Sequence, residues 1–128
     1  MSKTALVTGA SSGIGEETAR TLHKLDYTVY AAARRTDRLE QLTPTGIHAL
    51  TMDVTDDESM TSGIEQIIAE TGRIDVLVNN AGFGLGQRFV GGDLAREEDA
   101  LNVMVRAVMV ASHAAGRAPA AAPPGRRL

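Results

Sequence analysis

The chain has 128 residues, of which 23% are charged, with a formal net charge of −3 at neutral pH and no cysteine. This mildly acidic balance argues against a nucleic-acid partner, and the lack of cysteine excludes a disulfide framework. No apolar run approaches the roughly 20 residues that cross a bilayer, and Met1-Ser2-Lys3 leaves no room for a signal peptide. We therefore expect a cytoplasmic protein with no membrane partner. The three histidines have no ligand-like spacing, so we expect no metal site.

A glycine-rich turn at residues 8–15 (TGASSGIG) follows the apolar run 5–7 and opens a helical pattern from Ile14 to Leu25. Glycine permits the backbone torsions of such a turn and a close approach of phosphate to the helix N-terminus. Gly15 precedes Glu-Glu-Thr, without the Lys-Ser or Lys-Thr of a nucleoside-triphosphatase loop, and Thr18 stands where G-x-G-x-x-G needs its third glycine. The turn therefore predicts a cradle for a dinucleotide pyrophosphate, formed by Gly9, Ser11, Ser12, Gly13, Ile14 and Gly15. The same helix is predicted to place Ile14, Thr18, Leu22 and Leu25 on one face.

A second strand is predicted over Thr28–Ala33, and Arg34 and Arg35 follow it directly. In a dinucleotide fold, an acidic residue at this place binds the 2′-hydroxyl of NAD, whereas guanidinium groups suit a 2′-phosphate. The pair favours NADP(H), with NAD(H) as the second choice. Alternatively, the two arginines only solvate a loop, where Asp37 neutralises part of their charge.

A third strand is predicted over Ile47–Met52 and ends at Asp53 and Val54. Residues 55–58 (TDDE) have the pattern of a capping box and open a helix that Gly72 ends. A fourth strand, Ile74–Val78, leads into residues 79–82 (NNAG). From the residues alone, Asp53 and the NNAG segment are also compatible with ordinary polar turns.

Four strands alternating with helices predict an α/β fold, a Rossmann-like doubly wound parallel sheet with the partial strand order 3-2-1-4. Ligands of such sheets bind beyond the carboxyl ends of the strands, where the order reverses. Both the glycine turn and the NNAG segment fall there.

The T-G-x-x-x-G-x-G pattern of residues 8–15 and the NNAG of residues 79–82 resemble the signatures of the short-chain dehydrogenase/reductase family. The resemblance implies an oxidoreductase that uses a nicotinamide coenzyme and acts on a small-molecule alcohol or carbonyl substrate. It assigns the adenine edge to Asp53 and Val54, and the nicotinamide side to Asn80, Ala81 and Gly82. In a helix expected to open after Asp99, it assigns to Asn102 the catalytic asparagine that holds a proton-relay water. Asn102 could equally be an ordinary polar helix residue.

The chain departs from that family in its catalytic groups. The family carries a serine and a Tyr-x-x-x-Lys pair, but the only tyrosines here are Tyr27 and Tyr30, and the only lysines are Lys3 and Lys24. Loss of positioned acid–base groups costs roughly 10²- to 10⁴-fold each, so we expect coenzyme binding with little turnover. Three readings stay open: a truncated NADP(H)-dependent oxidoreductase, a catalytically silent NADP(H)-binding module that can pair with a partner, and a non-functional gene fragment.

Residues 114–128, rich in alanine, proline, arginine and glycine, predict a disordered tail after an incomplete coenzyme-binding domain over residues 1–113. We expect an out-of-frame or truncated continuation, since alanine, arginine, proline and glycine dominate a shifted reading of GC-rich coding sequence. A basic amphipathic tail that binds a membrane or nucleic acid is the alternative, but it would need bulky apolar or aromatic residues. The fourth strand is then an uncovered sheet edge, which predicts self-association or a homo-oligomer. By the family resemblance, the helix near Asp99 could shield it by dimerisation.

Overall fold

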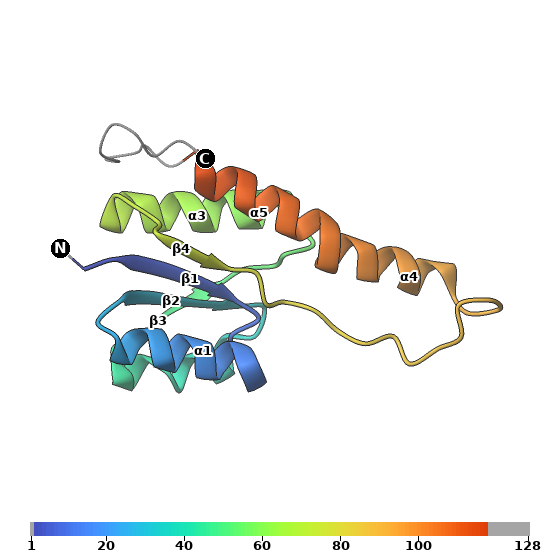
Figure 1. Cartoon of the computed structure of the whole chain (residues 1–128), viewed down its shortest axis with the longest axis horizontal. Helices are drawn as coiled ribbons and strands as arrows, with labels where there is room; N and C mark the ends of the chain where they lie inside the picture. Colours follow the sequence, from blue (N-terminus) through green and yellow to red (C-terminus); the bar gives the residue numbers. More distant parts are fainter. Residues whose placement is uncertain (1, 118–128) are drawn as a thin grey trace.

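The computed structural model describes residues 2–117 and contains one sheet with helices on both faces (Figure 1). The elements in chain order are β1 Thr4–Thr8, α1 Gly13–Lys24, β2 Thr28–Ala33, α2 Thr36–Glu40, the 3₁₀ turn η1 Thr43–Thr45, β3 His48–Thr51, α3 Asp57–Thr71, β4 Val76–Val78, α4 Leu94–Leu101, the π-helical segment η2 Asn102–Arg106, and α5 Ala107–Gly116. No helix within these residues combines the length and the apolar character needed to cross a bilayer.

The four strands are parallel and lie in the order β3-β2-β1-β4, which confirms the predicted topology. In this register Leu6 of β1 lies between Tyr30 of β2 and Leu77 of β4. A hydrophobic core lies on each face of the sheet, and β1 contributes side chains to both because side chains alternate along a strand. Leu6 packs on the α3/α5 side, whereas Ala5 and Val7 pack on the α1/α2 side. The carboxyl ends of all four strands consequently meet at one edge, where the site lies.

Helix α1 packs on the sheet through its small residues. Gly15 and Ala19 are its buried positions, whereas Ile14 is 79% and Leu25 is 64% exposed. Of the three apolar residues on the predicted face, Leu22 is the one that packs against the core. The buried positions of this helix are thus occupied by glycine and alanine and not by longer side chains.

The cap of α3 differs from the predicted capping box. Asp56 is the N-cap, and its Oδ1 accepts from the backbone N of Glu58 at 3.0 Å and of Ser59 at 3.4 Å. The Thr55 hydroxyl instead donates to Asp53 Oδ1 at 2.7 Å. The prediction was one residue early because Thr55 and Asp56 both suit the N-cap, and the turn at Asp53 takes the threonine. As predicted, Gly72 ends the helix, with φ of 78°.

Two further predicted boundaries were wrong. The last helix begins at Leu94, five residues before Asp99, because Asp93 caps it by accepting from Ala95 N at 3.0 Å. At the other end, α5 continues to Gly116 because Ala114 and Ala115 pack on the core, so the first residues of the predicted tail are helical. Residues 118–128 of that tail lie outside the described residues. Sequence analysis also assigned no element to α2 and η1.

Candidate functional site: a cleft at the carboxyl ends of the strands

A cleft of about 1030 Å³ opens beyond the carboxyl ends of the strands. Its volume is at the upper limit of the roughly 300–1,000 Å³ typical of cofactor sites. The predicted site residues that line it are Gly9, Ser11, Ser12, Arg34, Arg35, Asp53, Val54, Asn80, Ala81, Gly82 and Asn102. Sequence analysis missed Ala33, Met52, Thr55, Phe83, Asp99 and Val103, which also line it. Ala33 and Met52 could have been found as the residues at which strands end.

The remaining predicted residues, Gly13, Ile14 and Gly15, do not line the cleft. In the glycine turn, close packing excludes a side chain at Gly15 and at Gly9. A Cβ on Gly15 would collide with the carbonyl oxygen of Gly9 and with Asn80 Nδ2. A Cβ on Gly9 would come within 2.9 Å of Ala81 Cα. The glycine turn and the NNAG segment therefore pack directly on each other. Asn80 Nδ2 also donates to the Gly9 carbonyl at 3.2 Å.

Gly13 is glycine for a different reason. Its φ is 59°, in the left-handed region, yet no atom lies within 4 Å of where its Cβ would be. The backbone conformation, and not a neighbour, excludes a side chain there. The open space beside Gly13 leaves the turn accessible from solvent.

The N-terminus of α1 faces this turn without a side-chain cap. Ser12 occupies the N-cap with extended torsions (φ −164°, ψ 168°), and within residues 2–117 its hydroxyl makes no capping hydrogen bond. The first helical bond runs from Glu16 N to the Ser12 carbonyl at 3.4 Å. First-turn amides without a side-chain acceptor, together with the helix dipole, form an anion-binding arrangement. Glu16, which would oppose an anion, lies 3.5 Å from Arg20.

Arg34 and Arg35 lie exposed on the rim at the end of β2. Among residues 2–117 the ion pairs are Arg20–Glu16, Arg73–Asp75 and Arg106–Asp57, so neither Arg34 nor Arg35 is paired. Asp37 therefore forms no ion pair with them. The two guanidinium groups remain open to an anionic ligand.

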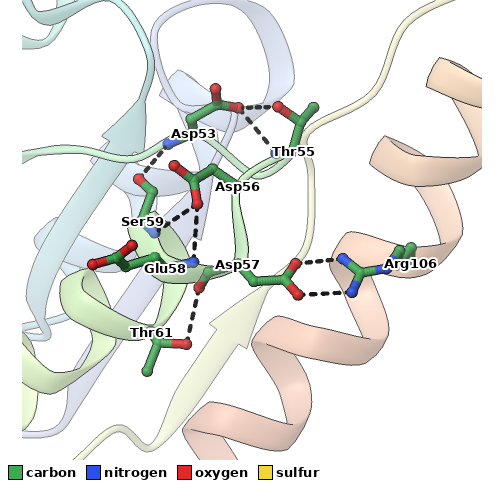
Figure 2. A network of polar contacts seen from close by, with 8 residues as sticks. All are labelled: Asp53, Thr55, Asp56, Asp57, Glu58, Ser59, Thr61 and Arg106. Atoms are coloured by element: carbon green, nitrogen blue, oxygen red, sulfur yellow. Dashed lines mark hydrogen bonds and ion pairs between the residues drawn. The ribbon is translucent and has the colours of Figure 1, made fainter.

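Asp53 belongs both to a turn and to the cleft. Its Oδ1 accepts from the Thr55 hydroxyl at 2.7 Å and from Thr55 N at 2.9 Å (Figure 2). These hydrogen bonds, with a smaller contribution from the charge of Arg34, lower the pKa of Asp53. The carboxylate is thus held ionised at the lip of the cleft, where it lines the wall beside Val54.

The opposite wall comes from the last helical segment. Asp99, Asn102 and Val103 line it, and Asn102 is the first residue of the π-helical η2. The wide turn is closed by a bond from Ala107 N to the Asn102 carbonyl. π-Helical turns inside α-helices are rare and occur frequently at functional sites.

Neither tyrosine reaches the cleft. The Tyr30 hydroxyl donates to Glu70 Oε2 at 2.5 Å, and its ring stacks on His48 with centroids 4.8 Å apart. Burial, and then the hydrogen bond and charge of Glu70, raise the pKa of Tyr30 to about 12. Tyr27 precedes β2, at the opposite end of the strand. Within the described part of the chain, no group of histidine, aspartate and glutamate side chains is arranged to bind a metal.

Comparison with known proteins assigns the chain to a family. Residues 3–126 match the family described as short chain dehydrogenase. The 3-ketodihydrosphingosine reductase of Bacteroides thetaiotaomicron is 43% identical over 94 residues, which are 73% of this chain and 32% of that protein. A solved short-chain dehydrogenase from Streptomyces avermitilis is 35% identical with a TM-score of 0.84, over 89% of this chain and 43% of that chain.

A solved metagenomic short-chain oxidoreductase in complex with NADP is 31% identical with a TM-score of 0.78, over 88% of this chain and 54% of that chain. Members of this family bind NAD(P). The chain spans about a third of the length of the first curated relatives, 32% of the reductase and 36% of a serine 3-dehydrogenase from Agrobacterium fabrum. With its sheet order, its glycine turn and these matches, the chain belongs to the short-chain dehydrogenase/reductase family.

Proposed function

We propose that this chain binds NADP(H) in preference to NAD(H), in the cleft at the carboxyl ends of β1, β2, β3 and β4. The observation that carries the proposal is the meeting of two kinds of positive group in one cleft: the uncapped N-terminus of α1 and the unpaired Arg34 and Arg35. A dinucleotide with a 2′-phosphate carries its anionic groups at two separate places, and the cleft offers a donor group for each.

The residues present fit such a coenzyme. The first-turn amides after Ser12 would receive the pyrophosphate, and Gly13 leaves its side of the turn open. Arg34 and Arg35 would hold the 2′-phosphate through planar forks, while Asp53 and Val54 would lie against the adenine. Asn80, Ala81, Gly82 and Asn102 would border the nicotinamide half. The coenzyme, when bound, supplies the hydride chemistry of an oxidoreductase.

For the whole protein, the family supports oxidoreductase activity on a small alcohol or carbonyl. Asn102 is the one residue of this chain to which we assign a catalytic role, that of holding a proton-relay water. Its exposed side chain at the start of a π-turn supports that role because it borders the cleft.

A second proposal, favoured by the position of Tyr30, is that the 128-residue chain binds the coenzyme without turnover. The Tyr30 hydroxyl is held by Glu70 and has a raised pKa, so it cannot serve as the acid or base beside a substrate oxygen. An assay of the purified chain with NADPH and a panel of aldehydes, ketones and quinones tests this, and clear turnover would refute it.

Titration calorimetry with NADPH and NADH tests the coenzyme proposal. We expect tighter binding of NADPH, and a loss of about 10- to 100-fold in NADPH affinity for Arg34→Ala or Arg35→Ala, since charge-assisted bonds are lost. Arg38→Ala is the matched control, because Arg38 is exposed on the neighbouring α2 and does not line the cleft. NADH affinity should change little in all three variants. Equal affinity for the two coenzymes in the unaltered chain would exclude the assigned role of the arginines.

A further inference from the structure

The wall that carries Asn102 is held to the rest of the molecule mainly at one end. Of the side chains in residues 94–106, only Ala100 and Val103 are buried. Helix α5, which follows, places Ala107 and Ala111 in the core beside Met60 and Ile64 of α3. In Figure 1, α4 extends away from the sheet while α5 lies along α3. The wall is therefore docked through α5 and needs a further contact to fix its position at the cleft.

That contact is an ion pair between α3 and η2. Arg106 Nη2 donates to Asp57 Oδ2 at 2.7 Å, and Arg106 Nη1 donates to Asp57 Oδ1, so that the two planar groups meet through two parallel bonds (Figure 2). Asp57 is the first residue of α3, and the segment before it includes Asp53 and Thr55 on one wall of the cleft. Arg106 is the last residue of η2, whose first residue is Asn102 on the other wall. The ion pair thus joins the two walls.

The exposure and geometry of this ion pair indicate that it orients η2 and contributes little to the stability of the fold. Both side chains are about half exposed, 48% for Arg106 and 50% for Asp57, and exposed ion pairs contribute little to folding stability. A two-bond contact between a guanidinium group and a carboxylate nevertheless fixes the relative orientation of both groups, which a lysine ammonium cannot do. Because α5 is anchored independently by its buried alanines, loss of the pair should release η2 without unfolding the domain.

The orientation of η2 affects the residues of the π-turn that lie near the cleft and the NNAG segment. Ala107 N reaches the Asn102 carbonyl across the turn that Arg106 completes. Met104, within the same turn, lies 3.6 Å from where a Cβ on Gly82 would be. A shift of η2 would therefore move Asn102 and Met104 relative to the NNAG segment, whereas Arg34, Arg35 and the glycine turn stand on other elements.

We propose that Asp57 and Arg106 are positioning residues that hold η2 in place at the nicotinamide half of the coenzyme cleft. The inference rests on the proposed function, because it assigns the Asn102 wall to that half of the coenzyme. It predicts that the pair contributes to binding of the whole coenzyme and not to binding of its adenosine half.

The test compares NADPH with adenosine 2′,5′-bisphosphate, which carries the adenosine half and the 2′-phosphate alone. We expect Arg106→Gln, Arg106→Lys and Asp57→Asn each to weaken NADPH about two- to tenfold, the cost of ordering a released segment on binding. Affinity for the bisphosphate and the thermal midpoint should stay as in the unaltered chain. The double variant Asp57→Asn/Arg106→Gln should bind NADPH no more weakly than either single variant, because both changes remove one interaction.

Arg73→Gln is the matched control, since Arg73 pairs with Asp75 at the amino end of β4, away from the cleft. A readout without coenzyme keeps the inference testable: amide hydrogen exchange of residues 103–107 should accelerate in Arg106→Gln but not in Arg73→Gln, while β1 stays protected. Equal weakening of both ligands with a lowered thermal midpoint would assign the pair a purely structural role and overturn the inference. Unchanged affinity and unchanged exchange would also overturn it. If the unaltered chain bound neither ligand, the proposed function would fail, a result distinct from these two.

Discussion

The hydroxyl of Thr8 accepts a hydrogen bond from the backbone N of Asn80 at 3.1 Å. The same oxygen accepts from Ala81 N at 3.2 Å and donates to the Val78 carbonyl at 3.4 Å. Thr8 ends β1 and is only 2% exposed. One side chain thus connects the glycine turn to the NNAG segment, and the two motifs form a single structural unit.

Replacement of Thr8 should show what this junction contributes. Thr8→Val keeps the shape but leaves two half-buried N–H groups, those of Asn80 and Ala81, without this acceptor, so we expect a loss of about 1–3 kcal/mol in the free energy of unfolding. Thr8→Ser, which retains the hydroxyl, should lose less. Urea denaturation measures both, and equal stability of the valine and serine variants would contradict the role of the hydroxyl.

We expect close packing to disfavour a side chain at Gly15 as strongly as the backbone conformation does at Gly13. Gly15→Ala would drive a methyl group into the Gly9 carbonyl and the Asn80 amide. We expect a cost of about 1–3 kcal/mol, as for other overpacked sites, with weakened NADPH binding because the turn must shift. Gly84→Ala is the control, since no atom lies within 4 Å of its Cβ position. Thermal unfolding and NADPH titration of the two variants test this. Equal stability and equal NADPH affinity of Gly15→Ala and Gly84→Ala would contradict the packing argument.

Stability at high pH should report on Tyr30. Its pKa is raised from 10.0 to about 12, first by burial and then by Glu70. A group that holds its proton more tightly when folded stabilises the fold below its unfolded pKa, and this contribution is lost as the pH rises. We therefore expect the free energy of unfolding to fall by an amount on the order of 2 kcal/mol between about pH 10 and pH 12. Tyr30→Phe should lack this decline, and urea denaturation across that range checks it.

An apolar stripe on the last helical segment should govern self-association. Leu101, Val105 and Val108 recur at helical spacing and are 61%, 61% and 36% exposed. We expect concentration-dependent association of the chain, reduced in Leu101→Glu and Val105→Glu. Ser62→Glu, on the exposed side of α3, is the control. Sedimentation velocity measures the effect, and an association unchanged by either glutamate would direct attention to the β4 edge instead.

Much of the fold followed from local pattern. The apolar run 5–7 before a glycine turn, and the alternation of strand and helix patterns down the chain, predicted a parallel sheet in the order that the structure has. Errors occurred where two residues competed for one local role. Thr55 and Asp56 both suit an N-cap, and only the turn at Asp53 decides between them. Asp93, the true start of the last helix, carries a cap signal that sequence analysis did not use.

The candidate site divides in the same way. The pattern of residues 8–15 and the arginines after β2 predicted an anion-binding turn and a second cationic place, because backbone torsion and charge are local properties. The sequence could not predict that Gly15 is glycine because of Asn80, or that Asp57 meets Arg106 across 49 positions. Such contacts depend on how helices pack on the sheet, and packing brings together residues whose separation along the chain carries no signal. The chemistry of this chain was therefore determined by its sequence alone, whereas the tertiary structure decided which of those groups face one another.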